Sequence, residues 1–587
     1  MKPRHNLCLS ILIFALTGGA LAGPVDRPSP LVPNDLPNPQ SEEVFKMFHF
    51  FMPEGGLPPH KKTIPALLPG VPAIFPQEFR TIDGTNNNLS NPTLGSANTP
   101  FRRTTTDAYG DGFNTPAGAD QLGARDISNL VDAQSGSVPI ALPESAYWWA
   151  WGQFIDHDMM ITPIAVPTEA FNIPVPQCDP VFDPNCTGTA TIAFSRSAFA
   201  ADDNGVRQQL NANTHWLDGS QVYGSDDLRA QELRALDGTG HLKVGANNML
   251  PFNVDRFPNE PTNSRTFFLA GDVRANENSP LTALQTLFMR EHNFWADHFH
   301  SQDPTLTDDD LYFRARAIVG AEIQKITYSD FLPFLIGQDT LTTYAGYDEN
   351  VDPSIANVFG AAAWRFGHSM LSSKVIRLDA NNQSIGSVAL QATFFQPTQI
   401  SSVGIEPYLR GLAHQKVQEI DGLIIDAVRN FVQPHVVGFD LAALNMQRGR
   451  DHGLPRFNQV RLDYGLPAYT SFAALTTDTS MQAKLASAYN TVDDIDAWVG
   501  LLVETHQPNA LVGPTLIAIL KDQFERLRDG DRFWYEAYLD PTSLSFVRHN
   551  SKLSDIILRN TTITTELEVN VFILQRDRPT PTPTPTP

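Results

Sequence analysis

The segment from Trp149 to Asp158 constrains the fold most, because it places three ionisable side chains within an aromatic helix. It reads Trp149-Ala-Trp-Gly-Gln153-Phe-Ile-Asp156-His157-Asp158. On a helix Gln153 and His157 share one face, since they stand four residues apart. The tryptophans indicate burial, and burying Asp, His and Asp is costly unless they are paired, hydrogen-bonded or bound to a ligand. We therefore interpret this helix as part of a functional site; a surface helix with a polar stripe is the alternative.

Charge and cysteine content exclude several classes of protein. The 587 residues carry a formal net charge of −22. Such an acidic chain lacks the basic face that nucleic acid or an anionic membrane requires, so neither is an expected partner. Three cysteines without a CxxC pair exclude a disulfide-built scaffold, a zinc ribbon and a thioredoxin-type site. Length alone predicts roughly four domains of about 150 residues.

The N-terminus has the pattern of a secretory signal peptide. Lys2 and Arg4 precede an apolar run over 7–16, and the small residues Ala-Leu-Ala end at Ala22. We expect residues 1–22 to be removed and the protein to be secreted, either to the periplasm or outside the cell. A membrane anchor is the alternative, but the run is too short to span about 30 Å of hydrocarbon.

The remaining chain divides into three parts. Residues 23–80 form a Pro-rich segment that we expect to be extended, and 576–587 alternate Pro and Thr as an extended tail. The stretch 81–575 lies between them. Only Cys178 and Cys186 remain after cleavage, and in an oxidising compartment they are predicted to close a small loop.

The stretch between these ends is predicted to be mainly α, with few short β-strands. Leucines and phenylalanines recur at helical spacing over 281–294, and Thr307 followed by Asp310 predicts the start of another helix. Further helices are predicted over 145–158, 353–371, 407–431, 439–448, 481–489 and 513–527, and strands over 374–377 and 564–574.

Oxygen-bearing positions alternate along a loop after the first motif. Thr214, Trp216, Asp218 and Ser220 offer side-chain or backbone oxygens at every second residue. Ca²⁺ accepts such mixed oxygen ligands, but a turn rich in Asp, Gly and Ser has the same composition. Both interpretations are open from this segment alone.

Three later segments hold further candidates. Arg274 and Glu277 stand three residues apart and could form a surface ion pair. The histidines at 292, 298 and 300 suggest a metal, but no clean pair at i and i+4 lies beside a carboxylate, so we favour structural roles. The segments 364–369 and 444–453 contain His368 and Asn445. A lone helical histidine is usually a satisfied core or surface residue, and it becomes a candidate ligand when a polar partner can orient its second ring nitrogen.

Taken together and in this order, these segments resemble the animal-type haem peroxidases of the peroxidase–cyclooxygenase superfamily, in particular catalytic domains of the myeloperoxidase and peroxidasin type. The resemblance covers roughly Thr81 to Leu574 and includes 351–359 and 527–536. It implies one large helical haem peroxidase domain over 81–575, because the motifs must converge on one haem. It also implies a secreted enzyme that reduces H₂O₂ and oxidises halides, thiocyanate or phenolic donors through a ferryl intermediate.

The resemblance implies a role for each candidate. His157 matches the distal histidine, Arg274 the distal arginine, and Gln153 the residue hydrogen-bonding near that histidine. His368 matches the proximal iron ligand, and Asn445 accepts its other N–H.

Haem b and Ca²⁺ are the implied cofactors. Asp156 and Glu277 match carboxylates that form ester bonds to haem methyl groups in the mammalian members, and Arg365 and Arg448 fit positions near the haem propionates. The implied calcium ligands are Asp158, Thr214, Trp216, Asp218 and Ser220.

The resemblance also defines the chemistry and one departure from it. A neutral distal His157 can take a proton from H₂O₂ and return it to the leaving oxygen, while Arg274 stabilises negative charge. Members that oxidise chloride best have a methionine sulfonium link at the position of Asn278. We therefore expect no sulfonium bond and weak chloride oxidation.

Two alternatives compete with a peroxidase. A fatty-acid dioxygenase or cyclooxygenase uses a tyrosine three residues before the proximal histidine, but that position is Arg365 here, between Trp364 and Phe366. A secreted adhesion module with the same fold and no activity would be expected to lose the distal or proximal residues, all of which are present.

Overall fold

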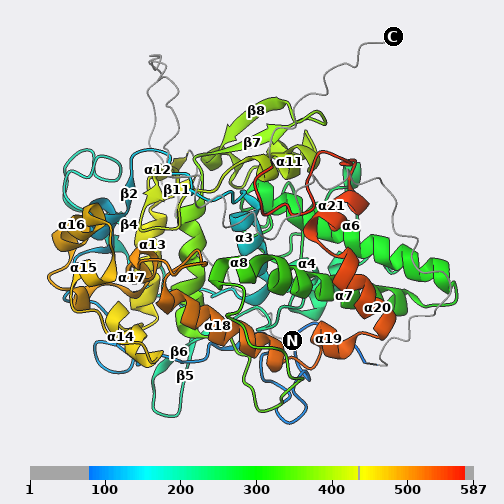
Figure 1. The fold of residues 1–587 in the computed structure, drawn as a ribbon, viewed down its shortest axis with the longest axis horizontal. Helices are drawn as coiled ribbons and strands as arrows, with labels where there is room; N and C mark the ends of the chain where they lie inside the picture. Colours follow the sequence, from blue (N-terminus) through cyan, green and yellow to red (C-terminus); the bar gives the residue numbers. More distant parts are fainter. Residues whose placement is uncertain (1–77, 434–435, 576–587) are drawn as a thin grey trace, which may run out of the picture.

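The computed structural model describes residues 78–433 and 436–575 (Figure 1). The predicted signal peptide, nearly all of the Pro-rich segment and the Pro-Thr tail lie outside the described residues. Helices dominate the described part, and the strands are short, which confirms the mainly α prediction. Within the described part, no helix is long and apolar enough to cross a membrane.

The α-helices of seven or more described residues are α3 (Tyr147–Met159), α5 (Asp227–Leu233), α6 (Ser279–Gln302), α7 (Asp308–Lys325), α11 (Glu406–His414), α13 (Leu441–Asp451), α14 (Phe457–Asp463), α16 (Thr479–Ala488), α17 (Ala497–Val503), α18 (Pro514–Asp529), α20 (Pro541–Asn550) and α21 (Leu553–Asn560). Shorter ones are α2 (Ala124–Ile127), α4 (Ser220–Tyr223), α8 (Leu332–Ile336), α9 (Asn357–Ala361), α10 (Thr398–Ser401), α12 (Asp426–Arg429) and α15 (Phe472–Leu475), with α19 (Tyr535–Tyr538). The 3₁₀ and π segments are η2 (Ser128–Asp132), η3 (Ala246–Asn248), η4 (Ile326–Phe331), η5 (Ala363–Met370), η6 (Leu390–Thr393) and η7 (Val492–Asp494).

The strands form small sheets of two or three. They are β1 (Thr99–Pro100), β2 (Ala133–Gln134), β3 (Ile173–Pro174), β4 (Thr191–Ile192), β5 (Phe199–Ala201), β6 (Arg207–Asn211), β7 (Lys374–Leu378), β8 (Ser384–Ala389), β9 (Ile424–Ile425), β10 (Phe431–Gln433) and β11 (Val436–Phe439). The antiparallel sheet β1-β6-β5 is the only three-stranded one within the described chain, and β2 pairs with β9 in parallel.

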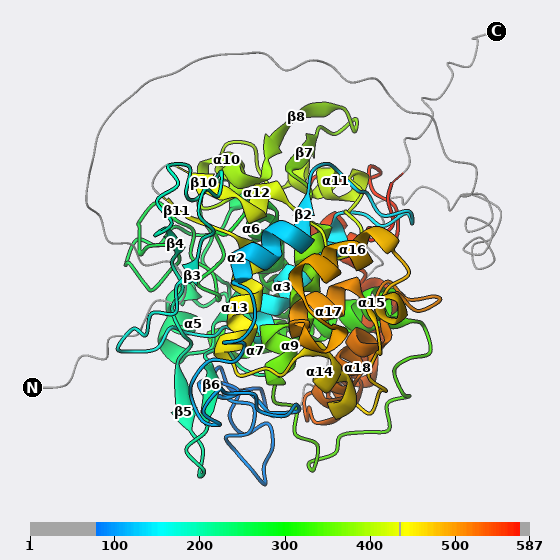
Figure 2. The ribbon, with the colours of Figure 1, turned by 90° about the vertical axis from the view of Figure 1, so that its left-hand side faces the viewer.

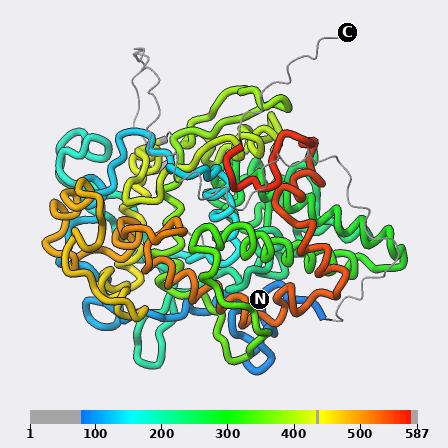
Figure 3. Tube along the Cα trace, in the orientation of Figure 1, coloured from blue at the N-terminus to red at the C-terminus, as the bar shows by residue number. Residues whose placement is uncertain are grey.

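Helix α3 lies at the centre of the molecule, as the cyan segment in Figures 2 and 3 shows, and it packs against α6, α4 and η5. Its aromatic side chains are the reason, because Trp148, Trp151 and Phe154 are buried and pack against Phe331, Phe288 and other rings. One continuous cluster of buried apolar residues surrounds this helix. The burial predicted from the tryptophans is confirmed.

Three sequence-based element predictions are wrong in part. The helix expected over 353–371 is divided into α9 and η5, because Ala362 leaves the helical region at φ −138°. The helix expected over 407–431 ends as α11 at His414 and is followed by β9 and α12. The strand expected over 564–574 is a series of turns in which Ile573 makes one isolated bridge to Glu144.

Other expectations are met. A capping box of Thr307 and Asp310 opens α7, and α13, α16, α18 and β7 form where helices and a strand were expected. Cys178 and Cys186 form a disulfide.

Candidate active site

Helix α3 presents its polar residues to different surroundings. His157 is only 2% exposed and Asp158 is fully buried, whereas Gln153 and Asp156 are half-buried. The carbonyl oxygens of His157 and Asp158 accept hydrogen bonds from Asn213 Nδ2 at 2.7 and 3.3 Å, which joins the end of α3 to the loop that follows β6. The ionisable side chains are therefore buried in a fixed framework.

Arg274 is held over the end of α3 by a carboxylate and a carbonyl. Its Nε and a terminal nitrogen donate to the two oxygens of Asp272 at 2.9 and 2.8 Å, and the same terminal nitrogen donates to Met160 O at 2.8 Å. The other terminal nitrogen lies 3.3 Å from Asp156 Oδ2. Burial would lower the pKa of Arg274, but the adjacent Asp272 raises it above its ordinary value. The guanidinium is a permanent, oriented cation.

His157 lies between two carboxylates. Its Nδ1 is 3.5 Å from Asp272 Oδ1, and its Nε2 is 3.5 Å from Glu277 Oε2. Burial alone would raise the pKa of Glu277, but its hydrogen bond to His157 and the charges of His157 and Arg274 lower it below its ordinary value. Asp272 therefore contacts Arg274 directly and lies close to His157.

Asp272 is a functional candidate that the sequence analysis missed. It lies two residues before Arg274 in the same segment, which was the available signal. Its proximity to His157 could not be predicted from the sequence, because the two residues are more than 100 positions apart and only the folded chain brings them together.

Asn278 joins α6 to α3. Its side chain accepts a hydrogen bond from Leu281 N at 2.9 Å and so caps the first turn of α6, and its Nδ2 donates to Gln153 Oε1 at 2.9 Å. This amide fixes the position of Gln153 relative to His157 on the same helix face.

His368 and Asn445 meet where η5 and α13 come together. Asn445 Nδ2 from α13 lies 2.8 Å from His368 Nδ1 in η5, which packs against α3. Burial and then the charge of Arg365 lower the pKa of His368 to about 3. The imidazole is thus neutral and leaves Nε2 as the nitrogen available to a metal.

The residues near His157 and those near His368 affect one another electrostatically. Burial raises the pKa of Asp156, and the charges of Arg274 and of Arg365, which lies three residues before His368, act against that rise. The structure therefore brings together residues predicted from segments that lie some 300 positions apart.

Comparison with known proteins agrees with this geometry. A family model described as animal haem peroxidase matches residues 79–572. The chain belongs to the animal haem peroxidase family. Human myeloperoxidase is 36% identical over 559 residues, which span 86% of this chain and 74% of that protein.

Solved structures give the same result for the fold. Peroxidase A from Dictyostelium discoideum superposes with a TM-score of 0.78 at 32% identity and covers 85% of this chain and 100% of that one. Oryza sativa fatty acid alpha-dioxygenase superposes with a TM-score of 0.72 at 22% identity, over 84% of this chain and 87% of its own, and shows the fold alone. The resemblance found in the sequence is confirmed, and the chain is a haem-dependent peroxidase, an oxidoreductase.

The residues present fit a haem peroxidase centre. His368 supplies a neutral imidazole, and the half-buried Arg365 and the buried Arg448 add two neighbouring cations. Burial and then the nearby charge of Arg448 lower the pKa of Arg365 to about 10. Carboxylates such as haem propionates would relieve this repulsion. Arg448 is itself held by Ser197 Oγ at 2.6 Å and Asp451 at 3.1 Å.

The five expected calcium ligands lie in one region, because the loop that contains Thr214, Trp216, Asp218 and Ser220 contacts Asp158 of α3. Asp158 accepts hydrogen bonds from the backbone N–H groups of Gly219 and Ser220 at 3.1 and 2.6 Å, and Thr214 Oγ1 donates to Asp218 Oδ1 at 3.2 Å. Trp216 uses its indole N–H on Gly84 O at 3.2 Å, so only its backbone carbonyl remains for a cation.

Two buried carboxylates lie close together here, Asp158 at the end of α3 and Asp218 in the loop. Asp218 Oδ2 has no hydrogen-bond partner among the described residues and lies 3.6 Å from Arg316. Burial, followed by the neighbouring Asp218, raises the pKa of Asp158 well above its ordinary value, and burial raises that of Asp218. An oxygen-binding divalent cation fits this donor set.

The histidines of α6 have structural surroundings. His292 lies between Tyr223 Oη at 3.0 Å and Gly240 O at 2.9 Å. Over 78–433 and 436–575 no group of three or more His, Cys, Asp or Glu side chains is arranged to hold a metal.

Proposed function

We propose that the protein is a secreted peroxidase that reduces H₂O₂ and oxidises bromide, iodide, thiocyanate or phenols in preference to chloride. The observations that support the proposal are the contacts of Asp272 with both His157 and Arg274 and the contact of Asn445 with His368, in a chain of the animal haem peroxidase family. We assign the catalytic unit to one domain over 81–575. We infer that residues 1–22 act as a signal peptide, which directs secretion and is cleaved near Ala22.

His157 would move the proton and Arg274 would stabilise charge. When haem is bound, its iron centre supplies the chemistry that takes oxidising equivalents from peroxide. His157 accepts a proton from H₂O₂ and returns it to the departing oxygen, and Gln153 on the same face helps to position the peroxide. Arg274, fixed by Asp272, lies ready for the negative charge on the departing oxygen.

His368 would hold the haem iron through Nε2, with Asn445 orienting the ring. Arg365 and Arg448 would bind the propionates. Asp156 and Glu277 would form ester bonds to haem methyl groups, and haem that extracts freely, as shown by mass spectrometry, would exclude these bonds.

Asn278 supports the donor preference. Its amide caps α6 and binds Gln153, so no thioether lies at this position and no sulfonium link to haem can form. We also assign Ca²⁺ to the loop of Thr214, Trp216, Asp218 and Ser220, together with Asp158 of α3.

A fatty-acid dioxygenase is the weaker candidate, because the tyrosine position of those enzymes is Arg365 and its guanidinium binds Gly360 O at 2.9 Å. An inactive module of the same fold is likewise disfavoured by the complete set of distal and proximal residues.

Steady-state assays of the haem-loaded protein with chloride, bromide, iodide, thiocyanate and a phenol test the proposal. We expect turnover with the last four, and a loss of about 10² to 10⁴-fold in His157→Ala, the usual contribution of general acid–base catalysis. The exposed His300→Ala is the matched control. No turnover with any of the five donors would overturn the proposal, and appreciable chloride turnover at neutral pH would overturn the donor preference.

A further inference from the structure

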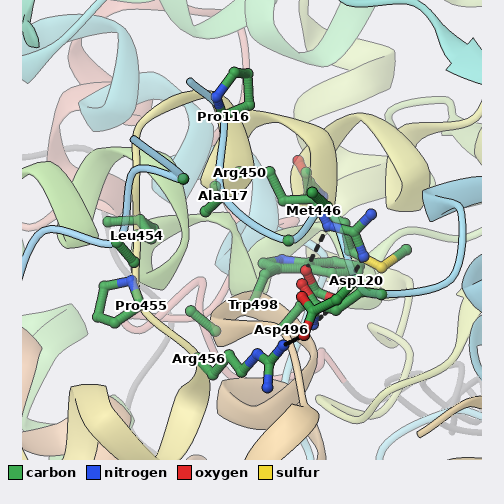
Figure 4. A pocket seen from close by; sticks show the side chains of 18 residues that line it. Pro116, Ala117, Asp120, Met446, Arg450, Leu454, Pro455, Arg456, Asp496 and Trp498 are labelled. Atoms are coloured by element: carbon green, nitrogen blue, oxygen red, sulfur yellow. Dashed lines mark hydrogen bonds and ion pairs between the residues drawn. The ribbon is translucent and has the colours of Figure 1, made fainter. Parts of the chain in front are cut away.

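A pocket of about 330 Å³ lies against α13 (Figure 4), and neither His157 nor Arg274 lines it. We call it the α13 pocket. It is lined by the loop over 108–121, by α13 and the turn after it over 445–456, and by the start of α17 at 496–498. Its volume is at the small end of the range for ligand pockets, which suits a molecule with one ring.

The wall of the α13 pocket is apolar, and its charges are paired. Figure 4 shows Pro116, Ala117, Leu454 and Trp498 around it. Arg450 donates to both oxygens of Asp496 at 2.9 and 3.0 Å. At the rim, Arg456 bridges Asp120 at 2.5 Å and Asp494 at 2.8 Å. Because each of these cations has its own carboxylate, the pocket favours a neutral aromatic ligand over an anion.

Two residues of this wall contact the proximal side of the site directly. Asn445 lines the pocket and its amide lies 2.8 Å from His368 Nδ1. Trp498 also lines it, and its indole N–H lies 3.4 Å from Arg365 O, in the same short helix as His368. A ring in the pocket is therefore separated from the iron ligand by a single layer of side chains.

We propose that the α13 pocket binds a neutral phenol and that this donor is oxidised there, one electron at a time, from the proximal side. The inference rests on the proposed peroxidase function and adds a second donor site. Each phenol gives one electron through the Trp498 and Asn445 layer and releases its proton to solvent. Two phenols and one H₂O₂ yield two phenoxyl radicals and two molecules of water, so electrons and protons balance.

Gly449 offers a way to close the pocket. It lines the pocket, and a Cβ at this position would meet only Leu454 Cδ1 at 3.6 Å, an ordinary contact. Gly449→Leu therefore fills the pocket, while the matched control Gly449→Ala leaves most of it open. Ala117→Phe fills it from the opposite loop and serves if Gly449→Leu does not fold.

The test measures phenol binding by calorimetry to the holoenzyme with cyanide bound, since cyanide occupies the distal side of the iron. We expect the wild-type protein and Gly449→Ala to bind phenol alike, and Gly449→Leu or Ala117→Phe to bind it at least tenfold more weakly. The Soret band of each variant reports that the haem site is intact.

A second readout separates binding from electron transfer. Gly449→Leu should raise KM for phenol, whereas Trp498→Phe should lower kcat and remove any tryptophan radical signal seen by electron paramagnetic resonance after peroxide addition. Phenol binding that is abolished by cyanide, or equal in all variants, would overturn the inference. If thiocyanate is still oxidised in that case, the proposed function stands; if no donor is oxidised by the wild-type protein, the proposed function itself fails.

Discussion

At the scale of single residues, the surroundings of His157 decide which ring nitrogen is available to a peroxide. Asp272 Oδ1 lies 3.5 Å from Nδ1, and Glu277 Oε2 lies 3.5 Å from Nε2. A proton on Nδ1, facing Asp272, would leave Nε2 with the lone pair that a general base requires, whereas a proton on Nε2 would face Glu277. Asp272, which also holds Arg274, is therefore the candidate that would position both groups.

We predict that Asp272→Asn lowers kcat/KM for H₂O₂ by about 10 to 100-fold, less than removal of the base itself. The amide cannot balance the charge of Arg274 or accept both of its hydrogen bonds. Stopped-flow measurement of the reaction of the holoenzyme with peroxide checks this, with the exposed Asp255→Asn as control. Unchanged kinetics in Asp272→Asn would show that Asp272 has only a structural role.

The catalytic candidates were more predictable from sequence than their supporting residues. His157, Arg274, His368 and Asn445 stand in segments that, taken together and in order, resemble those of a known family, and that resemblance supplied their expected roles. Asp272 does not, because an Asp near an Arg is common in any surface segment, and its role depends on a contact with a distant helix.

At the scale of elements, hydrophobic pattern predicted α3 well because aromatic residues occupy every side of it. It failed over 407–431, where the run Leu423-Ile424-Ile425 suits a buried helix or a buried strand equally. In the structure Ile424 and Ile425 pair with β2, some 290 residues earlier in the chain. A pairing so distant leaves no periodic signal in the local sequence.

Helix α6 gives a prediction about pH. Burial lowers the pKa of His292 to about 3, although the hydrogen bond of the ring to Gly240 O acts in the opposite direction. The unfolded chain binds the proton more readily between pH 6.5 and 3, so this histidine stabilises the fold above pH 6.5 and that stability is lost as the pH falls toward 3.

His292→Gln should therefore show a smaller fall in Tm than the wild-type protein between pH 7 and pH 4, even if its Tm at pH 7 is lower. Calorimetric scans at several pH values measure this. The exposed His300→Gln should follow the wild type. Parallel curves for His292→Gln and the wild-type protein would contradict the prediction.

At the scale of the whole molecule, the oxygen-rich loop ties α3 to the surrounding structure. We predict that removal of Ca²⁺ with a chelator lowers Tm, since a ligand at a hundredfold excess over its Kd stabilises a fold by about 2.7 kcal/mol. Ca²⁺ should restore the loss. Asp218→Asn should no longer respond to the chelator, whereas the exposed Asp237→Asn should respond like the wild-type protein. Identical scans with and without chelator would remove the calcium assignment.

The proposed haem site would take its side chains from α3, the Arg274 segment, η5 and α13, which lie far apart along the chain. A chain that is still being synthesised has no Asn445 to orient His368 until most of the protein has emerged from the ribosome. With this set of residues, cofactor loading would be a late event, after long-range contacts have closed. The haem content of a preparation would then report the fraction of molecules that have completed folding.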